Sequence, residues 1–396
     1  MSDELTNPHA ARRAPYLNIE RLEPGDYACT RELLTPLDFH LVLQSILAGL
    51  TPATLYVDAV DQPTAVFGWS GHRFFLAGRP DNAAFNAAVR NLFVNEIYPQ
   101  SLTSDTLEAF VLVYAPGWEA AIADLLHDKH PIRRMHQYYA ITPADADAAA
   151  AQDWRARTPP DFQVHAADAA LLAQTHLANL ELLREEMCSE RPSVPDFLAR
   201  SFGYCAVHAG QTLAGWCLSE YNTDDRCEVG IATLAPFQRQ GLAALLGAAL
   251  IDHAFSVGMR TVGWHCWADN LPSVKTALKL GLSHVCDYPS YLAFFDPALN
   301  LAVNGDMAFS AGDYGAARDW YRRAFAAGQS NAWAYWNAAC AYARLGEVDA
   351  ALAHLQTAVA HGFTNLDHIR NSSHMNALHV TPGWQALIAK LEAQSN

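Results

Sequence analysis

The stretch Cys227–Ala243, CEVGIATLAPFQRQGLA, decides the fold of the middle of the chain. Its first part belongs to a strand-like run, Arg226–Leu234, and a short loop then leads to an apolar helix, Gly241–Val257. Amide N–H groups at the start of a helix lack intrahelical partners and carry partial positive charge, so they attract anions. Gly241 lets the backbone approach an anion closely, and Ala243 leaves the next turn uncluttered. The run therefore predicts a phosphate-binding junction between a strand and a helix.

The segments on either side of this junction alternate between strand and helix patterns. Apolar residues at three- and four-residue steps indicate helices, and short β-rich runs between turn residues indicate strands. The order predicts a mixed α/β domain. Its other elements are strand Phe162–His165, helices Ala167–Glu186 and Ser193–Phe202, strands Tyr204–His208, Leu213–Glu220 and Thr261–Trp267, helix Pro272–Leu280, and strands His284–Tyr288 and Tyr291–Phe295.

The loop resembles that of a known family. Gln238-x-x-Gly241-x-Ala243 is similar to the acyl-CoA pyrophosphate loop of the GNAT N-acetyltransferases, written [R/Q]-x-x-G-x-[G/A]. Further along, Asn270-x-x-Ser273 is similar to the family pattern N-x-x-[A/S]. The resemblance covers residues 160–296 and implies a mostly antiparallel sheet flanked by helices, with acetyl-CoA as co-substrate. The histidines and cysteines are scattered through the sequence, so we expect no metal.

The resemblance also implies which residues hold acetyl-CoA. In the family, two strands diverge and the pantetheine arm pairs with the backbone of the first, here Glu228–Leu234. The residues expected to bind acetyl-CoA are Ile231, Thr233, Gln238, Arg239, Gln240, Gly241, Leu242, Ala243, Asn270 and Ser273.

Acetyl transfer to an amine needs a base for the amine proton and an acid for the leaving thiolate. The resemblance puts Glu228 at the position of a carboxylate base; a strand-end Glu facing solvent is the other interpretation. The family's usual acid, a Tyr seven residues after the Asn, is Ala277 here. Tyr288 and Tyr291 are the candidates to replace it, or are half-buried strand residues.

Two neighbouring residues, His265 and Cys266, lie in the run Trp264–Trp267. Strand alternation directs one of them to the helix side of the sheet and the other to the cleft. Each of the two residues has two interpretations. It is either a candidate for the chemistry or an ordinary core residue.

The N-terminal part also alternates strands and helices, and residues 65–296 resemble a bacterial GNAT subgroup with an additional N-terminal half. Expected strands are Thr54–Ala59, Ala65–Trp69, Arg73–Leu76 and Phe110–Tyr114, with an amphipathic helix at Ala83–Ile97. This half has no pyrophosphate loop, so we expect a degenerate GNAT-like domain. The chain would then carry tandem GNAT-like halves.

The last hundred residues contain a repeat. Ala311–Gly328 and Leu345–Gly362 superpose after a shift of 34 residues, with small residues at matching positions. A period of 34 with small residues where helices cross resembles tetratricopeptide (TPR) repeats. Two units are fewer than an independent array needs, so we expect them to pack on a neighbouring domain. Pro382, Trp384 and Leu387 predict a terminal capping helix.

The patterns together predict three domains. They are a GNAT-like domain at 1–145, a GNAT acetyltransferase domain at 146–296 and all-α TPR-like repeats at 297–396, with a linker in Thr142–Pro160. Hydrophobic residues make up 51% of the 396 residues, which is enough for substantial cores.

Charge and composition restrict the partners. A formal net charge of -15 disfavours nucleic acid and anionic membrane, because both repel an acidic protein. No apolar run is long enough to span a bilayer, and the first eighteen residues lack a signal-peptide layout. The eight cysteines are scattered without a C-x-x-C pair, which is typical of a reduced, cytoplasmic protein.

These features predict an N-acetyltransferase that acts on a primary amine of a small molecule or peptide. Two other functions remain open at this point. One is a catalytically inactive acyl-CoA sensor, suggested by Ala277. The other is an adaptor that binds a protein partner through the TPR-like repeats.

Overall fold

The computed structural model describes residues 18–103, 107–145, 153–189 and 191–395. Contacts divide the chain into two compact units. The sheet unit comprises the described residues of Met1–Leu92, Val111–Ala121 and Arg133–Tyr291. The helical unit comprises those of Phe93–Phe110, Ile122–Ile132 and Leu292–Asn396. The domain borders after residues 145 and 296 stay predictions, and part of the expected linker lies outside the described residues.

A mixed twelve-stranded sheet organises the sheet unit, in the order β1-β2-β3-β4-β5-β12-β6-β11-β10-β9-β8-β7. Neighbours pair antiparallel except β4 with β5 and β10 with β11, among the pairs whose register is resolved. The strands are β1 (Glu20–Arg21), β2 (Thr54–Val57), β3 (Ala65–Ser70), β4 (Arg73–Gly78), β5 (Ala109–Tyr114), β6 (Ile132–Ile141), β7 (Phe162–Ala166), β8 (Gly203–His208), β9 (Thr212–Thr223), β10 (Arg226–Thr233), β11 (Thr261–Trp267) and β12 (Ser283–Phe294).

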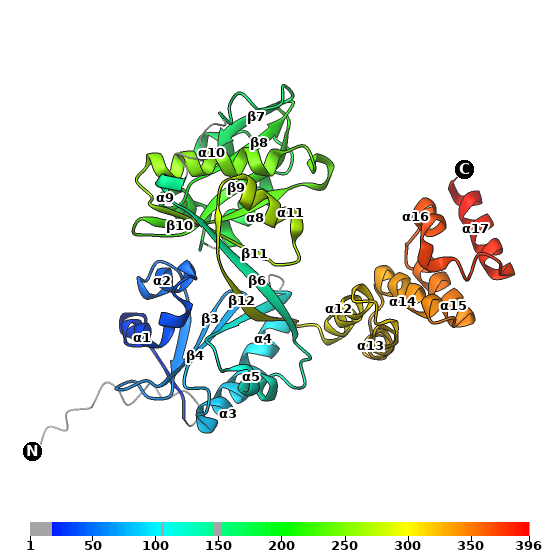
Figure 1. The fold of residues 1–396 in the computed structure, drawn as a ribbon, viewed down its shortest axis with the longest axis horizontal. Helices are drawn as coiled ribbons and strands as arrows, with labels where there is room; N and C mark the ends of the chain where they lie inside the picture. Colours follow the sequence, from blue (N-terminus) through cyan, green and yellow to red (C-terminus); the bar gives the residue numbers. More distant parts are fainter. Residues whose placement is uncertain (1–17, 104–106, 146–152, 190, 396) are drawn as a thin grey trace, which may run out of the picture. The chain divides into compact units, whose positions relative to one another are not determined.

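Two strands exchange places between the early and late parts of the sheet. β6 follows β5 along the chain but pairs with β11, from Val262 opposite Ile141 to Trp267 opposite His136. β12, the last strand, lies between β5 and β6. Figure 1 shows both as long strands that cross the middle of the sheet. The exchange joins the early and late parts of the chain into one continuous sheet.

Helices cover this sheet in positions that the sequence largely predicts. The expected helix over Gly241–Val257 is α10, and strand Thr261–Trp267 has the predicted bounds. The helices of the sheet unit are α1 (Arg31–Leu34), α2 (Leu41–Leu47), α3 (Ala83–Leu92), α7 (Ala169–Leu172), α8 (Leu180–Ser189), α9 (Val194–Arg200), α10 (Leu242–Ser256) and α11 (Leu271–Lys279); α5 (Glu119–Leu125) spans the border between the units.

Three sequence predictions about these elements were wrong. The helix expected over Ala167–Glu186 is two helices, α7 and α8, because Asn179 takes a φ of 68° that a helix cannot contain. The two strands expected after residue 283 are one strand, β12, which continues through Pro289. β6 was not predicted, because its residues do not alternate regularly between apolar and polar and include few β-branched side chains.

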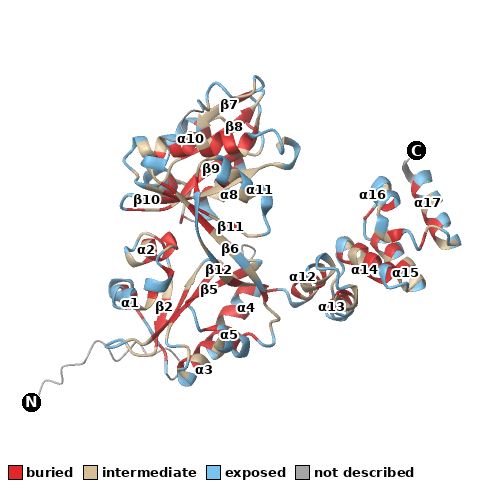
Figure 2. Cartoon of the chain, in the orientation of Figure 1, coloured by how far each residue is buried: buried red, intermediate tan, exposed pale blue. Residues whose placement is uncertain are grey.

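The core of the late half lies between α10 and the sheet. α10 is buried on most of its circumference, and Leu246, Leu250 and Ala254 are 0% exposed. A helix that is apolar all round must be covered on several sides. Figure 2 shows this burial continuing into the central strands.

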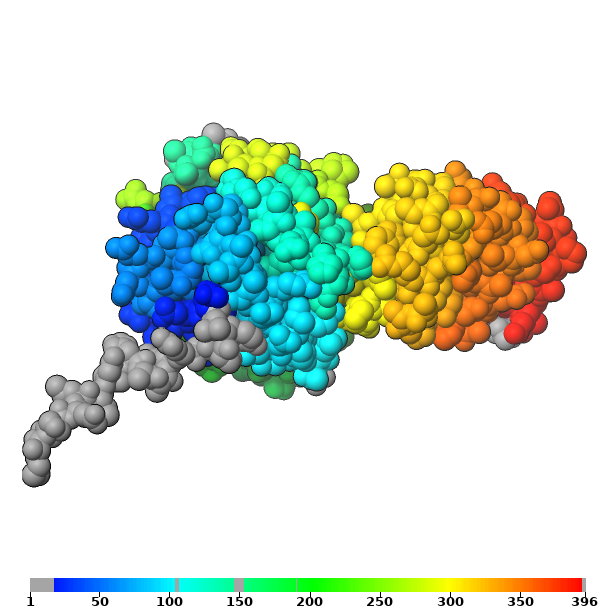
Figure 3. Space-filling view, turned by 90° about the horizontal axis from the view of Figure 1, so that it is seen from below, coloured from blue at the N-terminus to red at the C-terminus, as the bar shows by residue number. Residues whose placement is uncertain are grey.

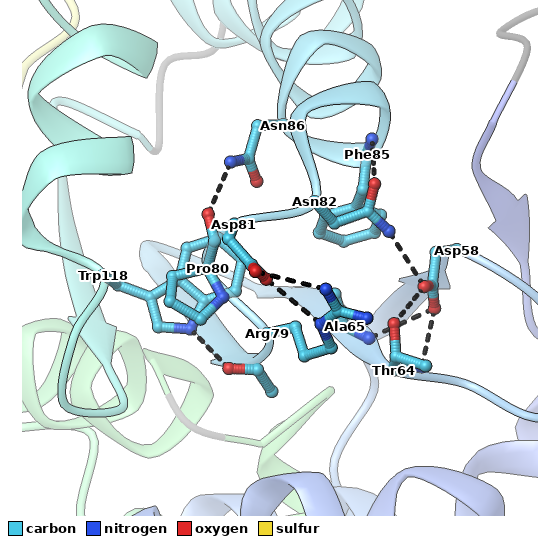
Figure 4. A network of polar contacts seen from close by, with 11 residues as sticks. Asp58, Thr64, Ala65, Arg79, Pro80, Asp81, Asn82, Phe85, Asn86 and Trp118 are labelled. Carbon is cyan, nitrogen blue, oxygen red and sulfur yellow. Dashed lines mark hydrogen bonds and ion pairs between the residues drawn. The ribbon is translucent and has the colours of Figure 1, made fainter.

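A polar network fixes the connection between β4 and α3 (Figure 4). The Asp58 carboxylate accepts hydrogen bonds from the amides of Thr64 (2.8 Å) and Ala65 (3.1 Å) and from Asn82 Nδ2 (3.0 Å). Asn82 Oδ1 in turn accepts from the Phe85 amide at 3.1 Å, which caps α3. The network ties the start of α3 to the β2–β3 turn.

Antiparallel helices make up most of the helical unit. Figure 3 shows residues 300–395 stacking in chain order, from yellow to red. The predicted terminal helix from Pro382 is confirmed as α17. The elements are η4 (Phe93–Ile97), α4 (Tyr98–Leu102), α12 (Pro297–Ser310), α13 (Tyr314–Ala326), α14 (Ala332–Arg344), α15 (Val348–Ala360), α16 (Leu366–Asn371) and α17 (Pro382–Ser395).

The two repeat units adopt matching hairpins, α12–α13 and α14–α15. Gly312 and Gly346 join the two helices of each hairpin with φ of 80° and 77°. The TPR assignment of these hairpins stays a prediction. None of the described helices is both long and apolar enough to cross a membrane.

Gly305 is the point of closest approach in the first hairpin. A Cβ there would lie 2.6 Å from Tyr321 Cε1, and the Tyr321 hydroxyl is held by Asp306 at 2.6 Å. We therefore expect Gly305→Ala to lower the free energy of unfolding by about 1–3 kcal/mol through overpacking. Denaturant unfolding followed by circular dichroism measures this change.

Gly315→Ala on α13 is the matched control. The nearest neighbour of its Cβ would be Asp313 Oδ1 at 3.7 Å, an ordinary contact. Since Ala is the better helix former, this variant should be neutral or stabilising by up to ~1 kcal/mol. Equal effects of the two substitutions would contradict the packing described for Gly305.

Candidate active site

The site lies where β10 and β11 separate. The two strands pair in parallel only from Arg226 opposite Thr261 to Glu228 opposite Gly263. Beyond this point β10 still pairs with β9, through Val229–Thr233, while β11 continues beside β6. The edge of β10 that faces β11 therefore opens into a gap.

Glu228 occupies the last paired position and is only 5% exposed. Its Oε1 atom accepts the backbone N–H of Leu41 at 2.7 Å. The same oxygen contacts His265 Nε2 at 3.1 Å. A buried carboxylate requires such donors, because an unpaired charge in a protein interior is costly.

His265 connects Glu228 to Tyr288. Its Nδ1 lies 2.8 Å from the Tyr288 hydroxyl, while its Nε2 faces Glu228. If Nε2 carries the proton and donates to Glu228, Nδ1 accepts the phenol O–H. Burial, and then the charge of Glu228, raise the pKa of Tyr288 well above its ordinary value. Tyr288 is therefore a protonated phenol at neutral pH.

Gly263 leaves room for this arrangement on β11. A Cβ at this position would lie 3.0 Å from both Glu228 Cγ and the Tyr138 hydroxyl. Tyr138 stacks on His265 with ring centroids 4.5 Å apart. The small residue thus allows the buried carboxylate and the Tyr138 ring to share one space.

A cavity of about 360 Å³ lies over these groups. Its lining combines carboxylates, imidazoles and one guanidinium with uncharged polar and apolar side chains. The lining residues are His40, Val42, His72, Arg73, Val111, Val113, His136, Glu220, Tyr221, Glu228, Val229, Gly230, Ile231, Trp264, His265, Cys266, Trp267, Asn270, Ser273 and Tyr288.

Several imidazoles at this cavity are held neutral. Burial, followed by the charges of His265 and Arg134, lowers the pKa of His136 to about 3. Burial, and then Arg73, lower the pKa of His72 to about 3. His136 also contacts Ser290 Oγ at 2.9 Å and stacks on Trp267. His136 and His72 therefore add no positive charge to the cavity at neutral pH.

The loop before α10 has the conformation expected of an anion site. Gly241 takes a φ of 82° immediately before the helix, and Arg239 takes 60°. The Gln238 side chain closes the loop by donating to the Thr233 carbonyl at 3.1 Å. Gln238, Arg239, Gln240 and Gly241 are exposed, whereas Leu242 is buried. The first amides of α10 are therefore directed to accessible space.

Two residues at the strand end could contact a ligand arm. Ile231 lines the cavity, and Thr233 is half-buried. The Thr233 hydroxyl is buried and has no partner among the described residues. Since a buried hydroxyl without a partner is unfavourable, this atom fits a ligand that supplies one.

Asn270 and Ser273 line the same cavity and also hold α11 in place. Asn270 Oδ1 accepts the Ser273 amide at 3.3 Å, which caps the helix. Ser273 Oγ accepts from Trp264 Nε1 at 3.0 Å. Ala277, one turn further, is 0% exposed in the core, so that helix position offers no group to the cavity.

A family model described as GNAT acetyltransferase matches residues 31–291. This range covers about two thirds of the 396 residues and includes every group of the site. The chain belongs to the GNAT acetyltransferase family. A search of curated proteins found no match.

Several solved structures are similar to this GNAT acetyltransferase. A GCN5-related N-acetyltransferase-like protein from Streptococcus suis is 19% identical, with a TM-score of 0.50 over 68% of this chain and 98% of that one. An N-acetyltransferase from Sphaerobacter thermophilus is 13% identical, with a TM-score of 0.44 over 70% and 96%. A tandem GNAT protein from the clavulanic acid pathway is 11% identical, with a TM-score of 0.44 over 70% and 98%.

The other sequence candidates of this GNAT acetyltransferase are only partly gathered at the cavity. Tyr288 lines it, whereas Tyr291 is outside the lining and stacks on Tyr114 at 5.6 Å. Cys266 lines the cavity, but burial raises the pKa of its thiol, which disfavours the reactive thiolate. No group of three or more His, Cys, Asp or Glu residues in the described chain could hold a metal ion.

Sequence reasoning missed the contribution of the early half. His40, His72, Arg73 and His136 line the cavity together with Glu228. No motif marks these residues, because they reach the site only through the shared sheet. Arg73 begins the predicted strand Arg73–Leu76 and His72 precedes it, so the sequence placed both residues in the fold without indicating a role for either.

The low pKa of His136 makes a prediction about stability. The unfolded side chain takes up its proton near pH 6.5, whereas the folded one does so only near pH 3. Between these values the unfolded chain binds more protons, so lowering the pH from 7.5 to 5 should destabilise the fold. His136→Gln should reduce this loss by up to about 1 kcal/mol per pH unit.

Denaturant midpoints at pH 7.5, 6.5, 5.5 and 5 compare the two proteins. The variant should be no more stable than wild type at pH 7.5, and the difference should narrow as pH falls. If the denaturant midpoints of wild type and His136→Gln change in parallel over the whole pH range, the depressed pKa of His136 is ruled out.

Proposed function

We propose that this protein transfers an acetyl group from acetyl-CoA to a primary amine. The observation that carries the proposal is the separation of β10 from β11 directly after the buried Glu228. A free strand edge at this point suits an extended ligand arm, which can pair with backbone groups of β10. Membership of the GNAT acetyltransferase family supports acetyl transfer.

Acetyl-CoA would lie along β10 and reach the start of α10. The amides of Gly241, Leu242 and Ala243, together with Gln238, Arg239 and Gln240, would hold the pyrophosphate. Ile231 and Thr233 would pair with the pantetheine arm, with Asn270 and Ser273 on the opposite wall. Bound there, acetyl-CoA supplies the activated acetyl group.

Glu228 is the proposed base for the amine proton, and Tyr288 the proposed acid for the leaving sulfur. His265 lies between them, at 3.1 Å and 2.8 Å. It holds both groups in place, because its Nε2–H donates to the carboxylate while its Nδ1 accepts the phenol O–H. After turnover, exchange with solvent removes the proton from Glu228 and restores that of Tyr288. Tyr288 would supply from β12 the phenol that Ala277 cannot supply from α11. Tyr291 is outside the cavity lining and takes no part in this scheme.

The acceptor is proposed to be a small molecule, with a peptide as the wider alternative. A volume of 360 Å³ has to accommodate both the acyl group and the amine, which favours a compact acceptor. Glu220 and Glu228 place carboxylates at the cavity, and this charge suits a cationic amine. We propose a cytoplasmic enzyme whose helical unit is available to a protein partner.

Gly241→Glu should weaken acetyl-CoA binding by at least about tenfold, because a carboxylate there would repel the pyrophosphate. Gly258→Glu is the matched control at the other end of α10. Both glycines have positive φ, 82° and 97°, and a Cβ at either would meet nothing within 4 Å. Isothermal titration calorimetry with acetyl-CoA measures both variants.

Equal affinities of the two variants would show that the phosphates bind elsewhere. If wild type itself does not bind acetyl-CoA at millimolar concentration, the acetyltransferase proposal fails.

Glu228→Gln should lower kcat about 100-fold while leaving the acetyl-CoA Kd nearly unchanged, since a general base contributes on this scale. Thiol release from acetyl-CoA with a panel of primary amines measures kcat. Glu185→Gln on α8, an exposed site in the same unit, controls for the change in charge.

An unchanged kcat at every pH would remove Glu228 from the mechanism. Acetyl-CoA binding by wild type without thiol release on any amine would instead support an acyl-CoA sensor.

A further inference from the structure

His40 is a buried imidazole whose Nε2 atom has no partner among the described residues. The side chain is 7% exposed, yet it lines the cavity beside Glu228, His265 and Tyr288. A buried ring nitrogen without a hydrogen bond is unfavourable, and most buried polar atoms in proteins have a hydrogen-bond partner. The position of this atom at the cavity wall points to a ligand atom as its partner.

The ring is held in place without using Nε2. It stacks on His265 with centroids 4.9 Å apart and planes inclined by 4°. Its edge meets the Tyr288 ring at 4.6 Å and 83°. The next residue, Leu41, donates its backbone N–H to Glu228 at 2.7 Å. These contacts fix His40 next to the base while leaving one nitrogen available.

The neighbouring polar atoms are already engaged with one another. His265 uses both ring nitrogens, one on Glu228 and one on Tyr288. Tyr288 and Glu228 are therefore partners of His265, and neither is bonded to His40 in the described chain. Among these four side chains, the free ring nitrogen belongs to His40.

His40 is also uncharged at neutral pH. Burial, and then the neighbouring charges of His265, His136 and Arg73, lower its pKa well below the ordinary value. A neutral imidazole carries one N–H, which can donate to an uncharged oxygen without placing a cation next to His265. An acyl carbonyl is the ligand oxygen that the proposed reaction brings into this cavity.

We propose that His40 donates its Nε2–H to the carbonyl oxygen of the acyl thioester. The inference rests on the proposed function and adds a substrate-contacting residue from the early half of the chain. The hydrogen bond strengthens as negative charge develops on that oxygen during transfer.

The reaction remains balanced with this role. The amine lone pair forms the new C–N bond, and the C–S bond breaks with its electron pair left on sulfur. The amine proton goes to Glu228, and the sulfur takes one from Tyr288. His40 keeps its own proton throughout, so it polarises the carbonyl without exchanging a proton.

Two coenzyme A derivatives isolate this contact. Acetyl-CoA has the carbonyl oxygen, whereas S-ethyl-CoA is a thioether with the same number of carbons and no carbonyl. Calorimetry gives the Kd of each derivative for the full-length protein. The Kd of S-ethyl-CoA divided by the Kd of acetyl-CoA measures how much the carbonyl contributes to binding. No amine acceptor is required.

His40→Phe should lower this ratio about tenfold, because it keeps a ring for stacking but removes the N–H. His40→Gln should retain most of the ratio, since its amide nitrogen can reach a similar position. The S-ethyl-CoA affinity of His40→Phe should match that of wild type, which also verifies that the variant is folded.

An unchanged ratio in His40→Phe overturns the inference and leaves the proposed function intact. Equal weakening of both ligands overturns it as well, because the contact is then not with the carbonyl. If wild type binds neither derivative, the proposed function and the inference fail together.

Discussion

The hydrogen bond from the Leu41 amide to the Glu228 carboxylate joins the two halves of the chain at the point where the chemistry is proposed. Its donor belongs to the start of α2 and its acceptor to β10, 187 residues further along. Glu228 could not be buried with its charge unless donors were supplied there, since the cost of desolvation is large. The early half is therefore part of the site, and the same connection positions His40 over His265.

The exchange of β6 and β12 supports this connection through backbone pairing. β6 brings Tyr138 and His136 against β11, and β12 brings Tyr288 against His265. Each half of the sheet is completed by a strand from the other, so the halves cannot separate without breaking backbone pairing. The parallel unit β4–α3–β5 repeats the design of β10–α10–β11, but Arg73–Leu76 pairs in register with β5 through four residues. Among the described residues, such an open gap is found between β10 and β11 and not between the resolved parts of β4 and β5.

The sequence predicted those elements whose local signals are strong. The α10 boundaries followed from Gly241 and a long apolar run, and the terminal helix followed from Pro382. It did not predict β6, whose pairing with β11 depends on contacts more than a hundred residues apart. It also divided β12 at Pro289, because proline disfavours the interior of a strand. A local sequence pattern cannot predict a strand exchange, because the exchange depends on pairing between residues far apart in the sequence.

The residues of the candidate site divide in the same way, into those with a local sequence signal and those that depend on distant contacts. Glu228 and the loop at Gly241 could be assigned through a motif, whereas His40 carries no motif at all. Ala277 marked the absence of the family's usual Tyr but gave no indication that Tyr288 contacts His265 from a different strand. A phenol supplied from β12 and an imidazole supplied from before α2 both depend on the shared sheet. The candidate site therefore draws its residues from both the early and the late part of the chain, and the shared sheet brings them together.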